Sequence, residues 1–468
     1  IRADLHDVNT VYVCLDNHKE GDYTPYLFKS TDMGKSWKSI SSNIPDRHLV
    51  WRTVQDHVKP NLMFAATEFG IFFTVDGGEK WTELTGGIPT IPFRDITIQR
   101  RENDLVAASF GRGFFVLDDY SALRDITEES LQEEAKLFAT RDALWYQPRN
   151  TDFSPGASMW AAENPPVGAV FTYYLKDSPT TMMQERKKKE SALNKEGKDI
   201  PFPGWEALNA EKNEIKDKVM LIVKDQQGKV VRKINAPNRK GMHRVVWDFS
   251  YPPAGPVSLR QRGGGFNRSG FPATPGTYTV TLSKIEDGVT SKLAGPMEFK
   301  VKRLYPGALT PKSDAEIAQY RMEIEDLLEN RGIVNTFMSD AMNRLNAMEV
   351  ALSRTAVEPG DLDKKLYDLK VKVQKMRAEL MGDDVRGEIG ERTAPTMGYF
   401  FGNAFAGLRS TYGPTDMHKE NLQFAKNGLS KLKEAVMELK EKDMPALEKE
   451  LEAIGAPWIE GMAAPKNK

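Results

Sequence analysis

The chain carries the stretch Thr74-Val75-Asp76-Gly77-Gly78-Glu79-Lys80-Trp81 and, before it, a match in Ser30-Thr31-Asp32-Met33-Gly34-Lys35-Ser36-Trp37. Both follow the pattern S/T-x-D-x-G-x-x-W, and their aspartates lie 44 residues apart (76 − 32). Internal repeats of about 40 to 50 residues are typical of β-propellers, in which each repeat forms one small antiparallel sheet, or blade. The repeated stretch therefore predicts propeller blades in the first part of the chain.

Each residue type in this pattern suits a tight turn. An aspartate side chain accepts hydrogen bonds from backbone N–H groups of its own turn, and a glycine adopts backbone angles that other residues disfavour. The Ser or Thr hydroxyl adds a local bond, and the Trp packs against the hairpin. We interpret the pattern as structural rather than catalytic, because functional sites are added to folds separately. The residues concerned are Ser30, Asp32, Gly34, Trp37, Thr74, Asp76, Gly78 and Trp81.

Short apolar runs surround the second copy of the pattern, at residues 62–67, 71–75 and 81–84. They predict three strands, and the alternation of polar and apolar residues at 94–98 predicts the first strand of a next blade. A third copy follows at an offset of 43 (105 − 62). Residues 1–120 therefore supply about three blades, whereas closed propellers usually have about four to eight. We expect that residue 1 is not a natural start and that further blades lie upstream.

After residue 120 the pattern changes to that of a different β unit. Residues 121–135 are interpreted as a linker, and residues 136–306 contain about six to eight short strand-like runs, which predict a β-sandwich of immunoglobulin-like type. A polar segment, 177–216, interrupts this unit. Its run Arg186-Lys187-Lys188-Lys189 is interpreted as a solvated helix face rather than a binding patch.

From residue 311 the apolar period becomes helical. Ser313-Asp314-Ala315-Glu316 is a capping box, and apolar residues then recur at steps of three and four in three separate stripes. They predict three amphipathic helices in an antiparallel bundle over residues 311–456, followed by a tail at 457–468. Pro445 is expected to break or kink the third helix. The stretch 392–414, rich in Gly, Phe and Tyr, is predicted to be a long ordered loop.

Composition narrows the function without naming it. The 468 residues include 65 basic and 66 acidic side chains, so the net charge is −1 and gives no argument for a nucleic acid or an anionic membrane as partner. The single cysteine, Cys14, allows no disulfide within the chain. No apolar run of about 18 residues predicts a transmembrane segment. The six histidines show no i, i+4 pairing, so we predict neither a metal site nor a cofactor.

The order of these parts resembles that of large bacterial sortilin-like proteins with Asp-box (BNR) repeats, which are often labelled glycosyl hydrolases. The resemblance is carried by the stretch 111–119 (GRGFFVLDD), by Val245-Val246-Trp247-Asp248 and by Gly413-Pro414-Thr415 before the last stripe. It implies a multidomain protein, mainly β and then α, that is the C-terminal portion of a longer chain. It also implies an extracytoplasmic location: secreted, periplasmic or at the cell surface.

Propeller geometry sorts the candidate site residues. The turn between the second and third strands of a blade lies on the same face as the link between blades, and the Asp-box turns lie on the opposite face. Glu68 and Asp95 are the acids near that face, but neither belongs to a catalytic motif, and Glu68 is expected to serve as a turn residue or to pair with Arg112. The candidates for the ligand face are Glu68, Arg112, Arg94, Asp95, Trp51 and Arg52.

We therefore expect a secreted or cell-envelope β-propeller protein that binds a protein, peptide or glycan ligand and is not catalytic in this portion. Besides that ligand, its partners would include the upstream blades of the same protein. One alternative is a glycoside hydrolase whose catalytic carboxylates lie upstream of residue 1. Another is a structural subunit of an envelope assembly.

Overall fold

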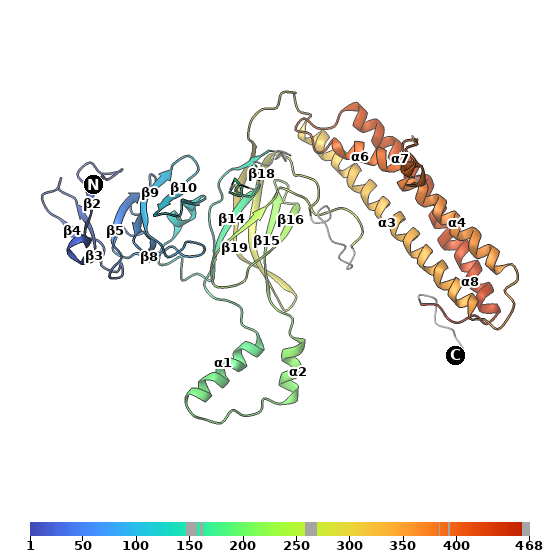
Figure 1. The fold of residues 1–468 in the computed structure, drawn as a ribbon, viewed down its shortest axis with the longest axis horizontal. Coiled ribbons are helices and arrows are strands. Elements are labelled where there is room, and N and C mark those ends of the chain that lie inside the picture. The colour runs from blue at the N-terminus through green and yellow to red at the C-terminus, as the bar shows by residue number, and fades with distance from the viewer. Residues whose placement is uncertain are drawn as a thin grey trace.

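A computed structural model describes residues 1–146, 156, 158–159, 162–257, 269–382, 384–391 and 394–460. These described residues form five β-sheets followed by a helical region at the C-terminal end. In Figure 1 three small sheets lie at the N-terminal end, two larger sheets lie in the middle, and the long helices lie at the other end. No helix in these described ranges is both long enough and apolar enough to cross a membrane.

The three N-terminal sheets are antiparallel and follow one another along the chain. The first is ordered β1 (Arg2–Ala3), β2 (Val11–Asn17), β3 (Asp22–Ser30), β4 (Lys38–Ser39). The second is ordered β5 (Val50–Gln55), β6 (Met63–Thr67), β7 (Gly70–Thr74), β8 (Thr82–Glu83). The third has three strands in the order β11 (Phe114–Leu117), β10 (Asp104–Ser109), β9 (Phe93–Gln99), and a 3-10 helix (Tyr120–Asp125) follows it. The strands expected around the second motif are thus present.

The second sheet is sandwiched between its two neighbours. All five residues of β6 are buried, which requires apolar neighbours on both faces because side chains alternate along a strand. Met63 and Ala65 share one core with Tyr12 and Leu27 of the first sheet. Phe64 and Ala66 share another core with residues of the third sheet. The three sheets therefore stack face to face in chain order.

The two repeated turns carry matching hydrogen bonds. Asp32 accepts the N–H groups of Lys35 and Ser36 through one carboxylate oxygen, each at 2.9 Å. Asp76 likewise accepts the N–H groups of the residues three and four positions later, at 3.0 and 3.1 Å. Gly78 has a φ of +101°, and a Cβ there would lie 2.9 Å from the Ile40 side chain. This position therefore excludes other residues for conformational and steric reasons together.

The two tryptophans of the motif have different surroundings. Trp81 is 3% exposed and donates its indole N–H to the backbone carbonyl of Ile40 in the first sheet. Trp37 is 45% exposed, and its indole N–H bonds the carbonyl of Gly34 in its own turn, at 3.1 Å. Trp81 packs at a junction between sheets, whereas Trp37 belongs to the first sheet, whose outer side has no neighbouring sheet among the described residues.

The middle of the chain contains two sheets that share one apolar core. One is ordered β12 (Ala135–Leu137), β14 (Ala169–Leu175), β17 (Gly241–Trp247). The other is ordered β13 (Ala143–Trp145), β19 (Val289–Arg303), β18 (Gly276–Glu286), β15 (Lys218–Asp225), β16 (Val230–Ala236), with β13 parallel to β19. Trp247 is fully buried between them and contacts the rings of Tyr278 and Phe299.

The polar segment between β14 and β15 forms two helices, α1 (Met182–Lys195) and α2 (Trp205–Asn213). Figure 1 shows them projecting away from the two sheets. Neither helix has a buried residue. They are joined by the guanidinium of Arg186, which donates to both carboxylate oxygens of Glu211 at 2.7 and 3.0 Å.

The helical region is built on one long helix. Its elements are α3 (Asp314–Ser353), α4 (Leu362–Met381), α5 (Asp384–Glu388), α6 (Met397–Ala406), α7 (Asp416–Glu438) and α8 (Met444–Ala453). The three predicted stripes lie on α3, α4 and α7 and supply most of the shared core. Residues 461–468 of the predicted tail lie outside the described residues.

One expectation for this region was wrong. The predicted loop at 392–414 contains α6, because Phe401 and Ala404 lie on one helical face and are fully buried against the neighbouring helices. Residues 392–393 of that stretch are not among those described. The expected interruption near Pro445 is present. A π-helical turn at Leu439–Asp443 separates α7 from α8, and Pro445 lies in the first turn of α8, because proline lacks the N–H that a continuous α-helix would need there.

Candidate functional site

Three of the predicted ligand-face residues meet at one end of the N-terminal sheets. The guanidinium carbon of Arg94, on β9, lies 3.6 Å from the ring centre of Trp51 on β5. The Trp51 indole N–H donates to Glu68 Oε2 at 2.9 Å, and Arg94 Nη2 lies 3.7 Å from the same oxygen. Glu68 belongs to the turn between β6 and β7. The starts of β5 and β9, from the second and third sheets, therefore converge with the turn between β6 and β7 at one point.

A second pair of predicted residues lies beside the first group. Arg52 Nε donates to Asp95 Oδ1 at 2.7 Å, which links the second and third sheets. The hydrogen bond from Arg52 outweighs burial and lowers the pKa of the Asp95 carboxyl below its usual value. Both side chains remain open to solvent in part. This pair thus holds the two strand starts together and leaves its charges accessible.

The group extends across all three sheets through two residues that the sequence did not single out. The His18 ring, in the turn after β2, meets the Trp51 ring edge-on with centroids 5.7 Å apart. Phe110, in the turn after β10, is 68% exposed, and its ring centre lies 5.3 Å from the Arg94 guanidinium carbon. His18 and Phe110 each follow the second strand of their sheet, as Glu68 does in the second sheet. Aligning the turns of the three repeats could therefore have found these two residues.

We name this row the rim and define it as His18, Trp51, Glu68, Arg94 and Phe110, together with the Arg52–Asp95 pair. The expected pairing of Glu68 with Arg112 was wrong, because Glu68 contacts Trp51 and Arg94 instead. Arg112 is exposed and forms no hydrogen bond or ion pair with any residue in the part of the chain that the structure describes. It lies in the turn after Phe110, where its charge faces solvent.

Both acids of the rim are engaged by neighbouring side chains. Glu68 accepts a hydrogen bond from the Trp51 indole N–H and lies beside the Arg94 guanidinium, and Asp95 accepts a hydrogen bond from Arg52. Among the described residues no group of three or more His, Cys, Asp or Glu side chains is arranged to hold a metal ion. Burial raises the pKa of the Cys14 thiol, in β2, to about 11, so this cysteine stays protonated and unreactive.

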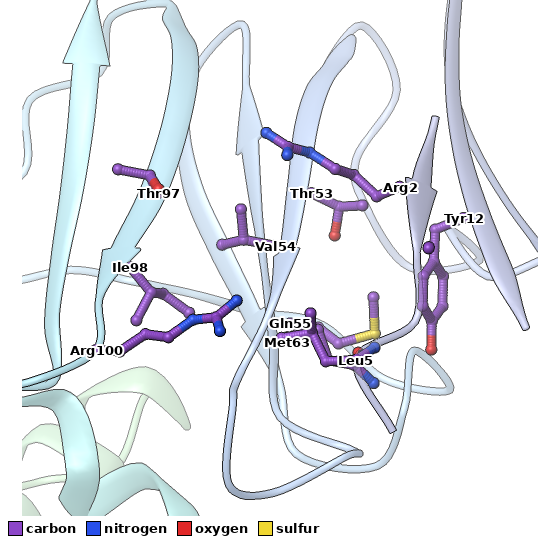
Figure 2. Close-up of a pocket in the computed structure, with 11 residues that line it drawn as sticks. Arg2, Leu5, Tyr12, Thr53, Val54, Gln55, Met63, Thr97, Ile98 and Arg100 are labelled. Carbon is purple, nitrogen blue, oxygen red and sulfur yellow. The ribbon is translucent and has the colours of Figure 1, made fainter. Parts of the chain in front are cut away.

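A pocket of about 320 Å³ lies along the strands β1, β5 and β9, which are the first strands of the three sheets. Figure 2 shows its lining, with Arg2 on one side and Arg100 on the other. The pocket adjoins the C-terminal half of β5, whereas the rim uses the N-terminal end of the same strand. The pocket and the rim are thus at separate places along β5 and β9.

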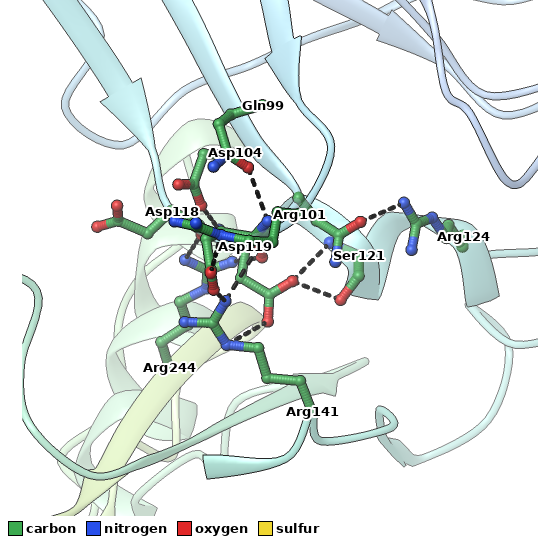
Figure 3. A network of polar contacts seen from close by, with 11 residues as sticks. Gln99, Arg101, Asp104, Asp118, Asp119, Ser121, Arg124, Arg141 and Arg244 are labelled. Atoms are coloured by element: carbon green, nitrogen blue, oxygen red, sulfur yellow. Dashed lines mark hydrogen bonds and ion pairs between the residues drawn. The ribbon is translucent and has the colours of Figure 1, made fainter. Parts of the chain in front are cut away.

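A polar network fastens the third sheet to the middle sheets (Figure 3). The guanidinium of Arg244, on β17, donates to the backbone carbonyls of Asp118 and Asp119, directly after β11. Arg141 lies 3.6 Å from the Asp119 carboxylate. Burial, followed by the charge of Asp104, raises the pKa of Asp118. This network and the apolar core that joins the third sheet to Phe138 and Tyr174 both link the small sheets to the middle sheets.

No protein-family model matches the chain, and no curated protein matches it. Among solved structures it is similar to the extracellular domain of a B. thetaiotaomicron protein described as a one component system, at 14% identity and a TM-score of 0.18, covering 64% of this chain and 31% of that one. It is also similar to an ancestral GH74 enzyme, at 13% identity and a TM-score of 0.21, covering 61% of this chain and 41% of that one. At these TM-scores the likenesses establish no shared arrangement.

Proposed function

We propose that this protein is a secreted or cell-envelope β-propeller protein that binds a protein, peptide or glycan ligand through the rim. In this proposal residues 1–120 are propeller blades, 121–135 a linker, 136–306 an immunoglobulin-like sandwich and 311–456 a helical bundle. The extracytoplasmic location is supported by the resemblance of the sequence motifs alone. The fold is supported by the repeat spacing and by three antiparallel sheets stacked in chain order.

The open ends of the stack support the presence of further blades. Phe114 and Val116 of β11 are 76% and 53% exposed, and Leu15 of β2 is 54% exposed. Repeat stacks normally end in a polar face, because an apolar end would be open to water. Apolar side chains on both the first and the third sheet therefore fit a ring that continues with additional sheets, which we propose are the upstream blades of the same protein.

One observation carries the binding function: the partly exposed stack of Arg94 on Trp51, bordered by Phe110 and anchored by Glu68. Trp and Arg are the residues most often found to dominate binding energy at interfaces. Here they are held rigid before any ligand arrives, so less conformational entropy is lost on binding. The aromatic faces would take an apolar or sugar-ring surface, and the partly exposed Arg94 and Arg112 would take acidic groups.

The structure gives no support to catalysis by the acids in this portion. The partners of Glu68 and Asp95 engage both carboxylates. Hydrolysis of a glycosidic bond needs one carboxyl group that can donate a proton and a second that can act on the sugar. A catalytic pair upstream of residue 1 would leave the rim in the role of substrate binding.

The test is a binding screen of the complete 468-residue chain on arrays of glycans and peptides, repeated with Trp51→Ala and Arg94→Ala. We expect at least one ligand class to bind the original protein and both variants to lose roughly tenfold or more in affinity. The matched control is Arg101→Ala, since Arg101 is an exposed arginine paired with Glu102 in the turn at the other end of β9. Ligands that bind all four proteins equally would exclude the rim as the binding surface.

A further inference from the structure

The pocket along β1, β5 and β9 is lined, among the described residues, by two positively charged side chains and by no negatively charged one. Arg2 of β1 and Arg100, directly after β9, both line it. Figure 2 shows their side chains extending from opposite sides toward Val54 of β5. Neither arginine forms an ion pair or a hydrogen bond with any residue of the described ranges. Two guanidinium groups thus face one cavity without a carboxylate between them.

The carboxylates around the pocket are already engaged. Asp4 accepts hydrogen bonds from the Tyr12 hydroxyl at 2.7 Å and from the Gln55 amide at 2.9 Å, besides two backbone N–H groups. Asp56 is fully buried, and Arg124 Nε donates to both of its carboxylate oxygens, at 2.8 and 2.9 Å. The Val58 backbone N–H also donates to it, at 3.2 Å. These acids cannot turn toward the pocket without leaving a buried or hydrogen-bonded group unpaired.

Asp95, on the rim, is an acid on which the charge of Arg2 acts. Its pKa is lowered first by the bond from Arg52 and, to a smaller extent, by the charges of Arg52 and Arg2. Asp95 therefore reduces the positive potential at the Arg2 end of the pocket but does not bind that arginine. At the other end, Arg100 has no ion-pair partner within the described ranges, so its positive charge remains available to a ligand in the pocket.

We propose that this pocket binds a small ligand of about sugar size through an anionic group, a carboxylate or a phosphate, held between Arg2 and Arg100. A guanidinium presents paired N–H donors that match both kinds of anion. The volume of about 320 Å³ lies at the lower end of the range for small-molecule sites. The half-buried apolar side chains of Val54 and Ile98 would cover the uncharged part of the ligand.

This site does not depend on the proposed function, because none of its residues belongs to the rim. A glycan or protein could occupy the rim while a small anion occupies the pocket. If the ring continues with further sheets, the inner strands of those sheets would add to the lining, but the two arginines come from this chain.

The test is calorimetric titration of the complete chain with D-glucuronate, inorganic phosphate and D-glucose. We expect glucuronate, phosphate or both to bind, and the neutral sugar to bind at least tenfold more weakly. Arg2→Gln and Arg100→Gln should each weaken anion binding by roughly tenfold or more. Arg101→Gln removes the same charge one residue from Arg100 but outside the pocket lining, and should bind as the original protein does.

The outcomes separate the sources of the anion. Binding of glucuronate alone assigns a carboxylate ligand, binding of phosphate alone assigns a phosphate ligand, and binding of both assigns a site for either. A further variant, Thr97→Tyr, leaves the charge unchanged and narrows the pocket, and should weaken glucuronate more than phosphate. The proposal is overturned if neither anion binds, if glucose binds as tightly as glucuronate, or if the arginine variants bind as the original does while circular dichroism shows them folded.

Discussion

The Trp51 indole N–H and the Arg94 guanidinium both meet Glu68 Oε2, at 2.9 and 3.7 Å. One carboxylate oxygen from the second sheet thereby holds an aromatic ring of the same sheet against a cation of the third. The Arg94–Trp51 stack spans the boundary between sheets without a buried core of its own. Its arrangement depends on the register of the two sheets, so it reports on how they pack.

Loss of the Glu68 carboxylate should loosen this arrangement without unfolding the protein. In Glu68→Gln the Trp51 bond can persist, but the attraction to Arg94 is lost. Because Arg94 is 40% exposed, solvent screening limits the effect on stability to about 0.5 kcal/mol or less. Chemical denaturation measures the free energy of unfolding, and the quenching of Trp51 fluorescence by added iodide measures ring accessibility. Increased quenching with unchanged stability is expected; a large loss of stability would contradict this account.

The two tryptophans of the repeated pattern should differ sharply in their contribution to stability. Trp81→Ala removes a buried ring and leaves a cavity between two sheets, which costs about 3–5 kcal/mol. Trp37→Ala removes a ring that is 45% exposed and should cost about 1 kcal/mol or less. Urea unfolding of the two variants gives the comparison, and each serves as control for the other. Equal losses would mean that Trp37 is covered in the native protein.

The Asp32 turn should be sensitive to acid. Hydrogen bonds from the Ser36 hydroxyl and the Ser36 backbone N–H are the leading causes that lower the pKa of Asp32 from 3.8 to about 2. The ionised form is therefore favoured in the folded state, and the stabilisation is complete above pH 3.8, declines below it and is lost below about pH 2. Melting temperatures measured over this interval should fall more steeply for the original protein than for Asp32→Asn. Parallel curves would show that the turn is not linked to this proton.

The junction in Figure 3 should control how the N-terminal sheets are held. Arg244→Ala removes the donors to the carbonyls of Asp118 and Asp119, so the link after β11 should open more often. Limited proteolysis is expected to cleave near residue 120 several times faster in this variant. Arg239→Ala, at an exposed position before the same strand, is the control for charge. Identical cleavage rates in the two variants would show that the apolar core around Phe138 holds the junction alone.

The sequence by itself determined the features that depend on local chemistry. The Asp32 and Asp76 turns could be read from eight residues each, because the hydrogen bonds that each aspartate carboxylate accepts come from within its own stretch. The helices α3, α4 and α7 could be read from their apolar stripes, because a helix that packs on one side must repeat with its own period. Trp51, Arg94 and Glu68 are in contact, as expected for strand starts and turns that fall at one end of their sheets. Their role as a ligand face stays a prediction.

Only the tertiary structure decided which partners those residues take. Whether a tryptophan of the motif is buried depends on the neighbouring sheet, which is present for Trp81 and absent from the described residues for Trp37. Glu68 contacts Trp51 and Arg94 rather than Arg112, a choice that depends on how the second and third sheets pack. Helix α6 forms in a Gly-rich stretch because burial of Phe401 outweighs its weak local propensity. Arg2 and Arg100 line the same pocket although they are 98 positions apart in the sequence (100 − 2). No local sequence pattern predicts that two residues so far apart will meet.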